Sequence, residues 1–283
     1  MTQQDFTFFD GVDPIAQSAL GAPLPDLARI GARQPSTYEG AWVHEGAVEL
    51  LMKMVGGYRP GRLQQKLQRS QLDELRDAEL VTGNELTDGG QLLVAVMDEA
   101  EASFRLSGLI GSREVLFQCW SSEQMALVIT QPGYHAVGNP EFAEQPTPEH
   151  VNIRVVPLLD LSTLMSKWVG LAPAWNFDIQ PVEIPMSAVE AQMNGGTSVP
   201  DGANDVLRDA WNEKWMLWSL EGGCPTGDLE PLTYLTAGRR GQQRLAQRDS
   251  GSIMLVPTAS TYVFDQLEDR IQALVFQRDV TLP

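Results

Sequence analysis

The sequence contains one strand–proline–helix pattern twice. It occurs as "VNIRVVPLLDLS" at residues 151–162 and as "GSIMLVPTAS" at residues 251–260. In each copy an apolar run reaches Val-Pro, and proline ends a strand ladder because it has no N–H to donate. Each copy therefore predicts the last strand of a meander, followed by a helix that turns back over the sheet.

The segments before the two corners also follow one order. Apolar residues at helical spacing predict helices within residues 38–101, as in "WVHEGAVELLMKMVG", where Val43, Ala47 and Leu50 share one face. From Ser103 the period changes to two, which predicts an antiparallel meander. The second half repeats helices, meander, Val-Pro strand and helix. This agreement in order and spacing predicts an internal duplication.

Two such halves would leave open sheet edges, which most simply join into one central antiparallel sheet. We therefore predict an α+β fold with an N-terminal arm at residues 1–37, a first half at 38–172 and a quasi-repeated second half at 173–283. The arm is rich in Pro, Gly and Asp, and we expect it to lie on the body or to form a partly disordered tail.

Composition limits where such a chain works. It has 37 acidic and 20 basic residues and a formal net charge of −17, which repels phosphate backbones and anionic lipids. Cys119 and Cys224 lack CxxC spacing and a nearby histidine, which indicates reduced structural thiols. The N-terminus lacks signal-peptide features, and no apolar run is long enough to span a membrane. We expect a soluble cytoplasmic protein.

The sequence gives no support for catalysis. His44, His135 and His150 lie outside any HxH, HExxH or Cys/His cluster, so no metal site is predicted. No GxSxG elbow, Walker loop or GxGxxG motif occurs, so we assign no catalytic or cofactor-binding residue. Groups that converge from distant segments would escape this search. We expect a protein that is not an enzyme.

Contact with a protein partner is the better expectation, and two segments are candidates. The long loop "QPGYHAVGNPEFAEQPTPEH" carries Tyr134, His135 and Phe142, and aromatic residues are frequent interface anchors. The same loop could instead pack onto the chain's own body. The segment "AGRRGQQRLAQR" concentrates positive charge at a predicted hairpin, where Arg239, Arg240 and Arg244 could dock an acidic partner or simply be solvated.

A DNA-binding regulator is the alternative. Residues 41–100 read as helices, a short hairpin and "LTDGGQLL", an order similar to a winged helix, with a basic face formed by Arg59, Arg62, Lys66 and Arg69. The net charge of −17 and the lack of stacking aromatics beside these side chains weigh against nucleic acid. Arginines presented on an open surface would favour this alternative.

Four segments together resemble the EspG family, cytosolic chaperones associated with ESX (type VII) secretion. They span most of residues 78–276 and read "ELVTGNELTDGGQLLVAVMDEAEASFRLSGLIGSREVLFQCWSSEQMALVI", "VNIRVVPLLDLSTLMSKWVGL", "FDIQPVEIPMSAVEAQM" and "GSIMLVPTASTYVFDQLEDRIQALV". The likeness is one of order and character, without a catalytic motif. The first 37 residues lie outside it.

This resemblance implies a quasi-two-fold fold in which two helical bundles flank the central antiparallel sheet. It also implies that the chain binds the tip of a helical PE–PPE-type secretion substrate and keeps it soluble. The family has no catalytic residues to carry over and no sharp binding motif. The partner expected from the resemblance is therefore a helical protein. The residues themselves, apart from the resemblance, lead us to expect no cofactor and no membrane. The oligomeric state stays open.

Overall fold

A computed structural model of the chain describes residues 40–122, 124–134, 149–171, 181–196, 198–201, 203–225, 227–247 and 251–275. The predicted arm at residues 1–37 lies outside this part of the chain, as does the predicted boundary between the halves at 172 and 173.

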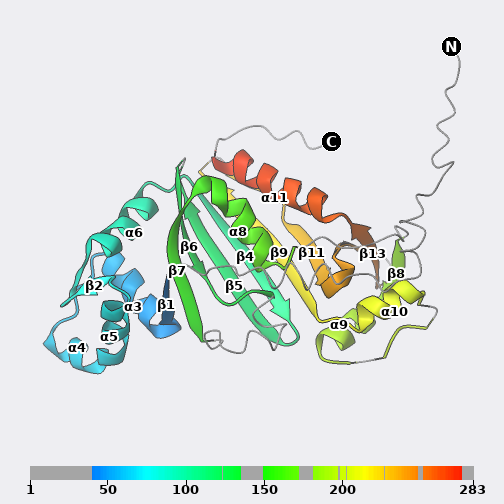
Figure 1. The fold of residues 1–283 in the computed structure, drawn as a ribbon, viewed down its shortest axis with the longest axis horizontal. Coiled ribbons are helices and arrows are strands. Elements are labelled where there is room, and N and C mark those ends of the chain that lie inside the picture. Colours follow the sequence, from blue (N-terminus) through cyan, green and yellow to red (C-terminus); the bar gives the residue numbers. More distant parts are fainter. Residues whose placement is uncertain are drawn as a thin grey trace, which may run out of the picture.

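Eleven strands in the described residues form one antiparallel sheet (Figure 1). The short β10 pairs only with β9, and the other ten follow the order β1-β7-β6-β5-β4-β9-β11-β12-β13-β8. The strands are β1 (Ala41–His44), β4 (Ala102–Ile110), β5 (Arg113–Ser121), β6 (Met125–Thr130), β7 (His150–Pro157), β8 (Val182–Pro185), β9 (Trp215–Cys224), β10 (Gly227–Asp228), β11 (Leu232–Ala237), β12 (Gln242–Gln247) and β13 (Ser252–Thr258).

The strand order is the same when it is read from the centre to either edge. From the central pair β4 and β9, one side continues through β5, β6 and β7 to β1, and the other through β11, β12 and β13 to β8. All neighbours are antiparallel, and both edge strands come from the segments before their meanders. This confirms the α+β fold with one central antiparallel sheet. The duplication of the sequence itself stays a prediction.

The two Val-Pro corners lie on β7 and β13, the strands that pair with the two edge strands. Leu158 N donates to Gln124 O on the β6 side, so the backbone groups of Pro157 point to the outer side of β7. Pro257 lies on the outer side of β13 in the same way, because Gly251 O accepts from Met186 N next to β8. The sequence predicted that both prolines end their strands. Pro157 does, whereas β13 continues to Thr258.

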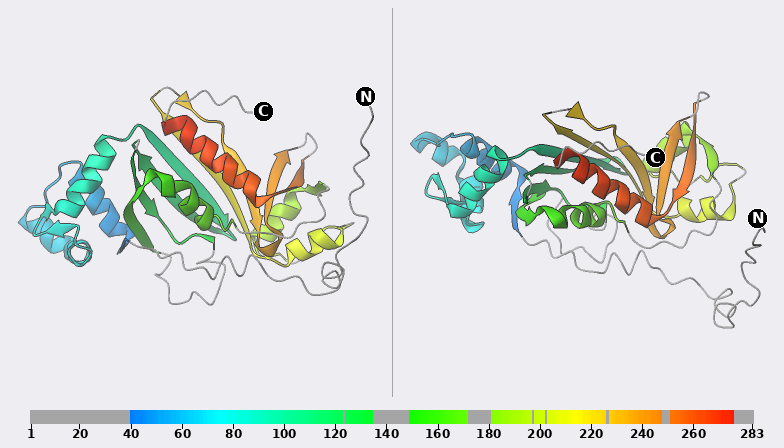
Figure 2. Two further views of the ribbon diagram at one scale, coloured as in Figure 1. Left: turned by 45° about the horizontal axis from the view of Figure 1, so that its top comes forward. Right: turned by 90° about the horizontal axis from the view of Figure 1, so that it is seen from above.

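Helices occur in three groups, which Figure 2 shows in two further views. Next to β1 lie α3 (Glu45–Val55), α4 (Arg62–Leu67), α5 (Arg69–Asp77) and α6 (Asp88–Asp98), with the small hairpin β2 (Val81–Thr82) and β3 (Glu85–Leu86) between α5 and α6. At the other end of the sheet lie α9 (Met186–Met193) and α10 (Asp205–Trp211). The third group is α8 (Leu161–Trp168), preceded by the turn η2 (Leu158–Asp160), and α11 (Ser260–Val275).

One face of the sheet is covered at its centre. Helices α8 and α11 lie over the central strands (Figure 1) and enclose the largest apolar core of the described residues. Strand residues of alternate positions, such as Leu106, Phe117, Trp218 and Tyr234, supply the sheet side of this core.

Among the described residues, helices cover the opposite face at its two ends. Leu127, Ile129 and Ile153 pack there against α3, α5 and α6, while Leu235 and Leu255 pack against α9 and α10. The chain thus has a central sheet with two separate helical groups on one face. No helix in the described residues is long and apolar enough to cross a membrane.

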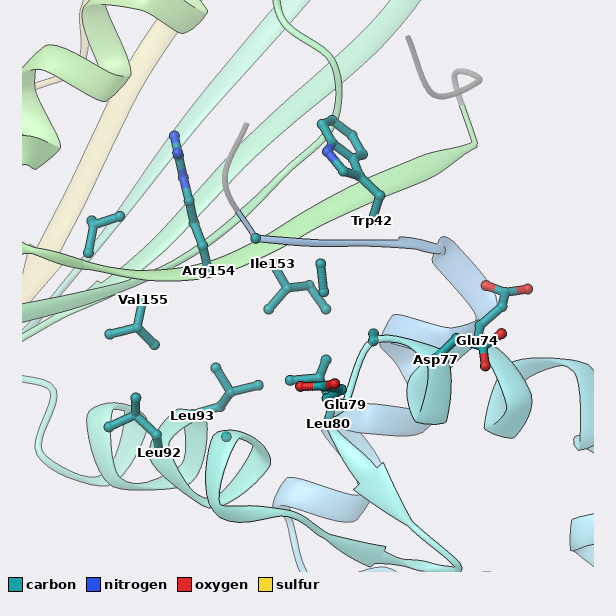
Figure 3. A pocket seen from close by; sticks show the side chains of 15 residues that line it. Trp42, Glu74, Asp77, Glu79, Leu80, Leu92, Leu93, Ile153, Arg154 and Val155 are labelled. Atoms are coloured by element: carbon teal, nitrogen blue, oxygen red, sulfur yellow. The ribbon is translucent and has the colours of Figure 1, made fainter. Parts of the chain in front are cut away.

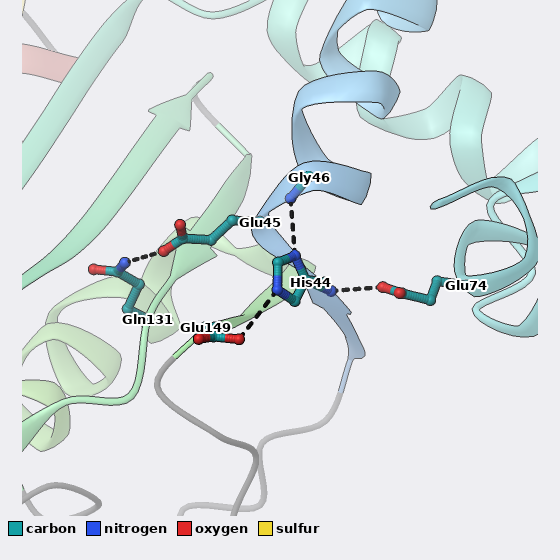
Figure 4. Close-up of polar contacts among 6 residues, drawn as sticks. All are labelled: His44, Glu45, Gly46, Glu74, Gln131 and Glu149. Atoms are coloured by element: carbon teal, nitrogen blue, oxygen red, sulfur yellow. Dashed lines mark hydrogen bonds and ion pairs between the residues drawn. The ribbon is translucent and has the colours of Figure 1, made fainter. Parts of the chain in front are cut away.

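The start of the first helix was predicted wrongly. Residues 41–44 form the edge strand β1, which pairs with β7, and α3 begins only at Glu45. His44 ends the strand and caps the helix, because its Nδ1 accepts a hydrogen bond from Gly46 N at 3.3 Å (Figure 4). Val43, Ala47 and Leu50 are nevertheless buried together, as their spacing predicted.

Candidate functional site

The centre of the second sheet face carries a strip of polar side chains that no helix or strand of the described residues covers. These side chains alternate with those of the main core, so they point away from α8 and α11. We call this surface the open strip; its residues are Arg105, Ser107, Gln118, Ser219, Glu221 and Thr233. It lies between the sheet regions covered by α3–α6 and by α9–α10, because Trp120 packs with the first group and Leu109 with the second.

The open strip joins residues from both halves of the chain, because β4 of the first half pairs with β9 of the second. Ser107 pairs with Ser219 and Arg105 with Glu221 across β4 and β9. The hydroxyls of Ser219 and Thr233 lie 3.2 Å apart. Arg105 and Glu221 are exposed, so the strip presents one positive and one negative charge side by side.

A hollow opens at one end of the strip. Its volume is about 580 Å³, and its lining includes Arg105, Gln118, Trp120, Glu221 and Pro231. Trp120 is half-buried and packs against the core beneath α3–α6. An aromatic side chain beside a charged pair suits the binding of a protein, because aromatic anchors supply area and charges supply orientation.

Of the predicted contact residues in the long loop, Tyr134 does not offer an exposed ring. It is buried in the main core, and its hydroxyl donates to Lys214 O at 2.7 Å. Gly170 lies against its ring, where a β-carbon would come within 2.9 Å of Cγ of Tyr134. His135 and Phe142 lie outside the described residues.

The predicted basic hairpin is present, as β11, the turn η3 (Gly238–Arg240) and β12. Arg240 forms an ion pair with Asp209 on α10, which ties the turn to that helix. Arg244 is exposed on β12, whereas the side chain of Arg239 lies outside the described residues. The structure thus leaves Arg244 at the surface and gives Arg240 a partner within the chain.

The basic face proposed for DNA is partly neutralised. Helix α4 buries no residue, and Arg62 and Lys66 on it are exposed. Arg59 lies 3.3 Å from Glu85, and Arg69 lies 3.6 Å from Asp73, measured between charged atoms. Surface pairs of this kind contribute little to stability, yet they lower the positive charge that a phosphate backbone would meet.

Within the described residues, the Cys119 thiol is a potentially reactive group, and it is buried. Burial raises the pKa of the Cys119 thiol, so the nucleophilic thiolate is disfavoured. His44 Nε2 lies 3.3 Å from Glu149 Oε2 in an exposed contact beside the cap of α3 (Figure 4). Across residues 40–275, leaving aside the gaps, no group of three His, Cys, Asp or Glu side chains could hold a metal ion.

The open strip is the site that the sequence alone did not reveal. Its signal is the alternation in "SFRLSGLI" and "WMLWSLEG", where Arg105, Ser107, Ser219 and Glu221 fall between apolar residues. That pattern identifies a solvent-facing strand surface. Only the pairing of β4 with β9 shows that the two surfaces are continuous.

A scan of the chain against protein-family models finds no matching family. A search of curated proteins finds no match either.

Proposed function

We propose that this chain is a non-enzymatic cytoplasmic chaperone or adaptor that holds a helical protein partner against the open strip. The observation that carries the proposal is the strip itself. In the part of the chain that the structure describes, it lies open between two helical groups, while α8 and α11 cover the opposite face. A sheet surface bounded by helices on both sides suits the binding of an elongated partner, since the sheet and both helical groups can contact it.

The residues of the strip support a protein guest in particular. Leu116 and Trp120 are half-buried on β5, so each still presents apolar surface beside the polar residues. Arg105 and Glu221 can orient a partner through charges of opposite sign. The mixture of apolar area and paired charge is typical of interfaces that form and dissociate rather than of permanent ones.

The resemblance to the EspG family gives the partner its proposed identity. That resemblance implies a central sheet flanked by two helical bundles and a guest of the PE–PPE type. We therefore propose a helical type VII secretion substrate as the partner. Leu116 and Trp120 beside the strip would cover the apolar part of its tip. The strip replaces the loop residue Tyr134 as the proposed contact surface, because that side chain is buried.

Co-expression tests the proposal. The tagged chain is produced together with helical substrate pairs of the PE–PPE type, and captured complexes are weighed by light scattering after size exclusion. We expect a stable complex that contains one copy of the chain. The variant Ser107→Arg, which places a long charged side chain in the middle of the strip, should lose the partner while keeping its own circular dichroism spectrum. Recovery of the chain alone with every substrate pair would refute the proposal.

The DNA-binding regulator remains the alternative, and one observation favours it. Helix α4 buries no residue and carries Arg62 and Lys66 exposed on its surface. Binding to random duplex DNA at low salt, lost steeply as salt is raised, would support this alternative. Retention of the duplex by a variant with Arg62→Glu and Lys66→Glu would exclude α4 as its binding surface.

A further inference from the structure

The outer edge of β7 is covered by its neighbour only in part. Strand β1 pairs with residues 150–153, and its last partner is Ile153. In the other half, β8 pairs with residues 252–255 of β13, so Leu255 has a partner in Val182. Val155 lies two residues before Pro157, as Leu255 lies two residues before Pro257. The position that β8 covers in the second half is thus left uncovered by β1 in the first.

The backbone of Val155 points to this uncovered side. Helix α3 follows β1 directly, and the backbone N–H of its first residue, Glu45, donates to Glu149 O. The odd-numbered residues of β7 therefore direct their backbone N–H and C=O groups outward, toward the side of β1. Leu158 N donates to Gln124 O on the β6 side, which gives the same alternation. Val155 therefore directs its backbone N–H and C=O outward. On its inner side it pairs with Leu127 of β6, but on its outer side no strand of the described residues pairs with it.

A groove with an apolar floor lies beside this edge. It has a volume of about 820 Å³, and Ile153 and Val155 form one wall (Figure 3). Leu80, Leu92 and Leu93 face this wall from the loop after α5 and from α6. Leu92 is 48% exposed, which is unusual for a leucine beside a core and leaves apolar surface open.

The rim of the groove is acidic. Glu74, Asp77 and Glu79 line it, and the last two are exposed. Glu74 is fixed in place, since its Oε2 accepts the backbone N–H of His44 at 2.8 Å (Figure 4). Arg154 also lines the groove, but its side chain points away from the carboxylates and the leucines (Figure 3).

We propose that this groove binds an extended, basic segment of a partner protein, which adds a strand to the outer edge of β7. Backbone hydrogen bonds to Val155 would set its register, as in other cases of strand addition. Alternate apolar side chains of the segment would then lie over Leu92 and Leu93. Lysine or arginine on either side of them would meet Asp77 and Glu79. The site is separate from the open strip, so it stands or falls independently of the proposed chaperone function.

Amide hydrogen exchange followed by NMR on the full chain tests whether the outer edge of β7 is open at Val155. In the free protein, the Val155 amide should exchange at least about 100-fold faster than the Leu255 amide. Within the described residues, Leu255 has a strand partner on its outer side and Val155 has none. Equal protection of the two amides would overturn the proposal, because it would mean that the edge is already covered by the chain itself.

A probe peptide tests whether the groove binds an extended basic segment. Its sequence is acetyl-Lys-Thr-Val-Thr-Leu-Thr-Lys-amide, in which the lysines and the apolar residues share one face. It should slow exchange at Val155 and shift the methyl resonances of Leu92. The same peptide with glutamates in place of the lysines should bind about 10-fold more weakly or worse. A peptide N-methylated at its three central residues, which removes their backbone donors for either strand direction, should lose the protection of Val155.

Matched protein variants complete the design. Asp77→Lys with Glu79→Lys should weaken the lysine peptide about 10-fold, and this loss should shrink at high salt. Asp98→Lys with Glu99→Lys makes the same charge change at exposed positions outside the groove and should leave binding unchanged. Binding that protects other amides, or that both pairs of substitutions weaken equally, would refute the assignment of this groove.

Discussion

Gly108 on β4 leaves the space that the indole of Trp168 on α8 occupies. A β-carbon at Gly108 would lie 3.2 Å from Cη2 of Trp168 and 2.9 Å from Cγ2 of Val115. It would also meet Cε of Met216, which is fully buried on β9. The absence of a side chain at this position therefore allows α8 to approach the centre of the sheet, where the two halves join.

The first prediction concerns this close approach. Gly108→Ala should lower the free energy of unfolding by about 1–3 kcal/mol, because an added methyl group must push apart a packed core. Gly46→Ala is the control, since the nearest atom to its β-carbon would be 3.6 Å away. The control should change stability by less than about 1 kcal/mol. Urea unfolding curves of both variants measure the difference, and equal stabilities would contradict the packing described.

The second prediction concerns a buried polar network beneath α8. Thr236 Oγ1 lies 3.1 Å from Trp218 Nε1, which donates to it, and 2.9 Å from Val169 O, to which it donates. Thr236→Val keeps the shape but leaves Val169 O without this donor. It should cost about 1–3 kcal/mol.

Thr233→Val provides the matched control on the open strip, because Thr233 is half-buried and its hydrogen-bond partner Ser219 remains accessible to water. The control should change stability by less than about 0.5 kcal/mol. Equal losses from both substitutions would show that the network at Thr236 adds nothing beyond an ordinary surface hydrogen bond.

The third prediction is a loss of stability at alkaline pH. Burial raises the pKa of Cys119, so the native state holds this proton more tightly than the unfolded chain does. The resulting stabilisation is complete below the unfolded thiol pKa of about 8.5 and is lost as the pH rises toward the folded value. Between about pH 8.5 and 10, the free energy of unfolding should fall by up to about 1.4 kcal/mol per pH unit.

Two variants separate the groups involved. Cys119→Ala should remove the slope in that pH window, whatever it does to stability at pH 7. Tyr234→Phe should keep the slope. Burial raises the pKa of Tyr234 as well, but the stabilisation from Tyr234 is lost only above about pH 10. Denaturant unfolding at a series of pH values gives both slopes. An unchanged slope in Cys119→Ala would contradict the assignment.

Much of the architecture could be predicted from the sequence because it depends on local patterns. The alternation in β4 and β9 and the proline corners at Pro157 and Pro257 identified strands, a meander and returning helices. The edge strand β1 escaped prediction because Val43 fits a helical face as well as a strand. The cap at His44 that separates the two depends on a side-chain geometry that spacing does not show.

Features made by distant contacts could not be predicted. Tyr134 looked exposed in a polar, proline-rich loop, yet it is buried because Gly170 leaves room for its ring and Lys214 O accepts its hydroxyl. The open strip likewise requires the pairing of Arg105 with Glu221, residues from the two halves of the chain. Sequence patterns find the alternate polar positions, but only the register shows that they form one surface.

The fourth prediction tests the open strip as a docking surface, and it uses the affinity of the chain for its captured helical partner. Glu221→Arg reverses a charge on the strip, and Glu268→Arg makes the same change at an exposed position on α11. Titration calorimetry should show binding at least about 10-fold weaker for the strip variant, a loss of about 1.4 kcal/mol, and unchanged binding for the control. Equal affinity for both variants and the parent chain would contradict the central claim that the partner is held on the open strip.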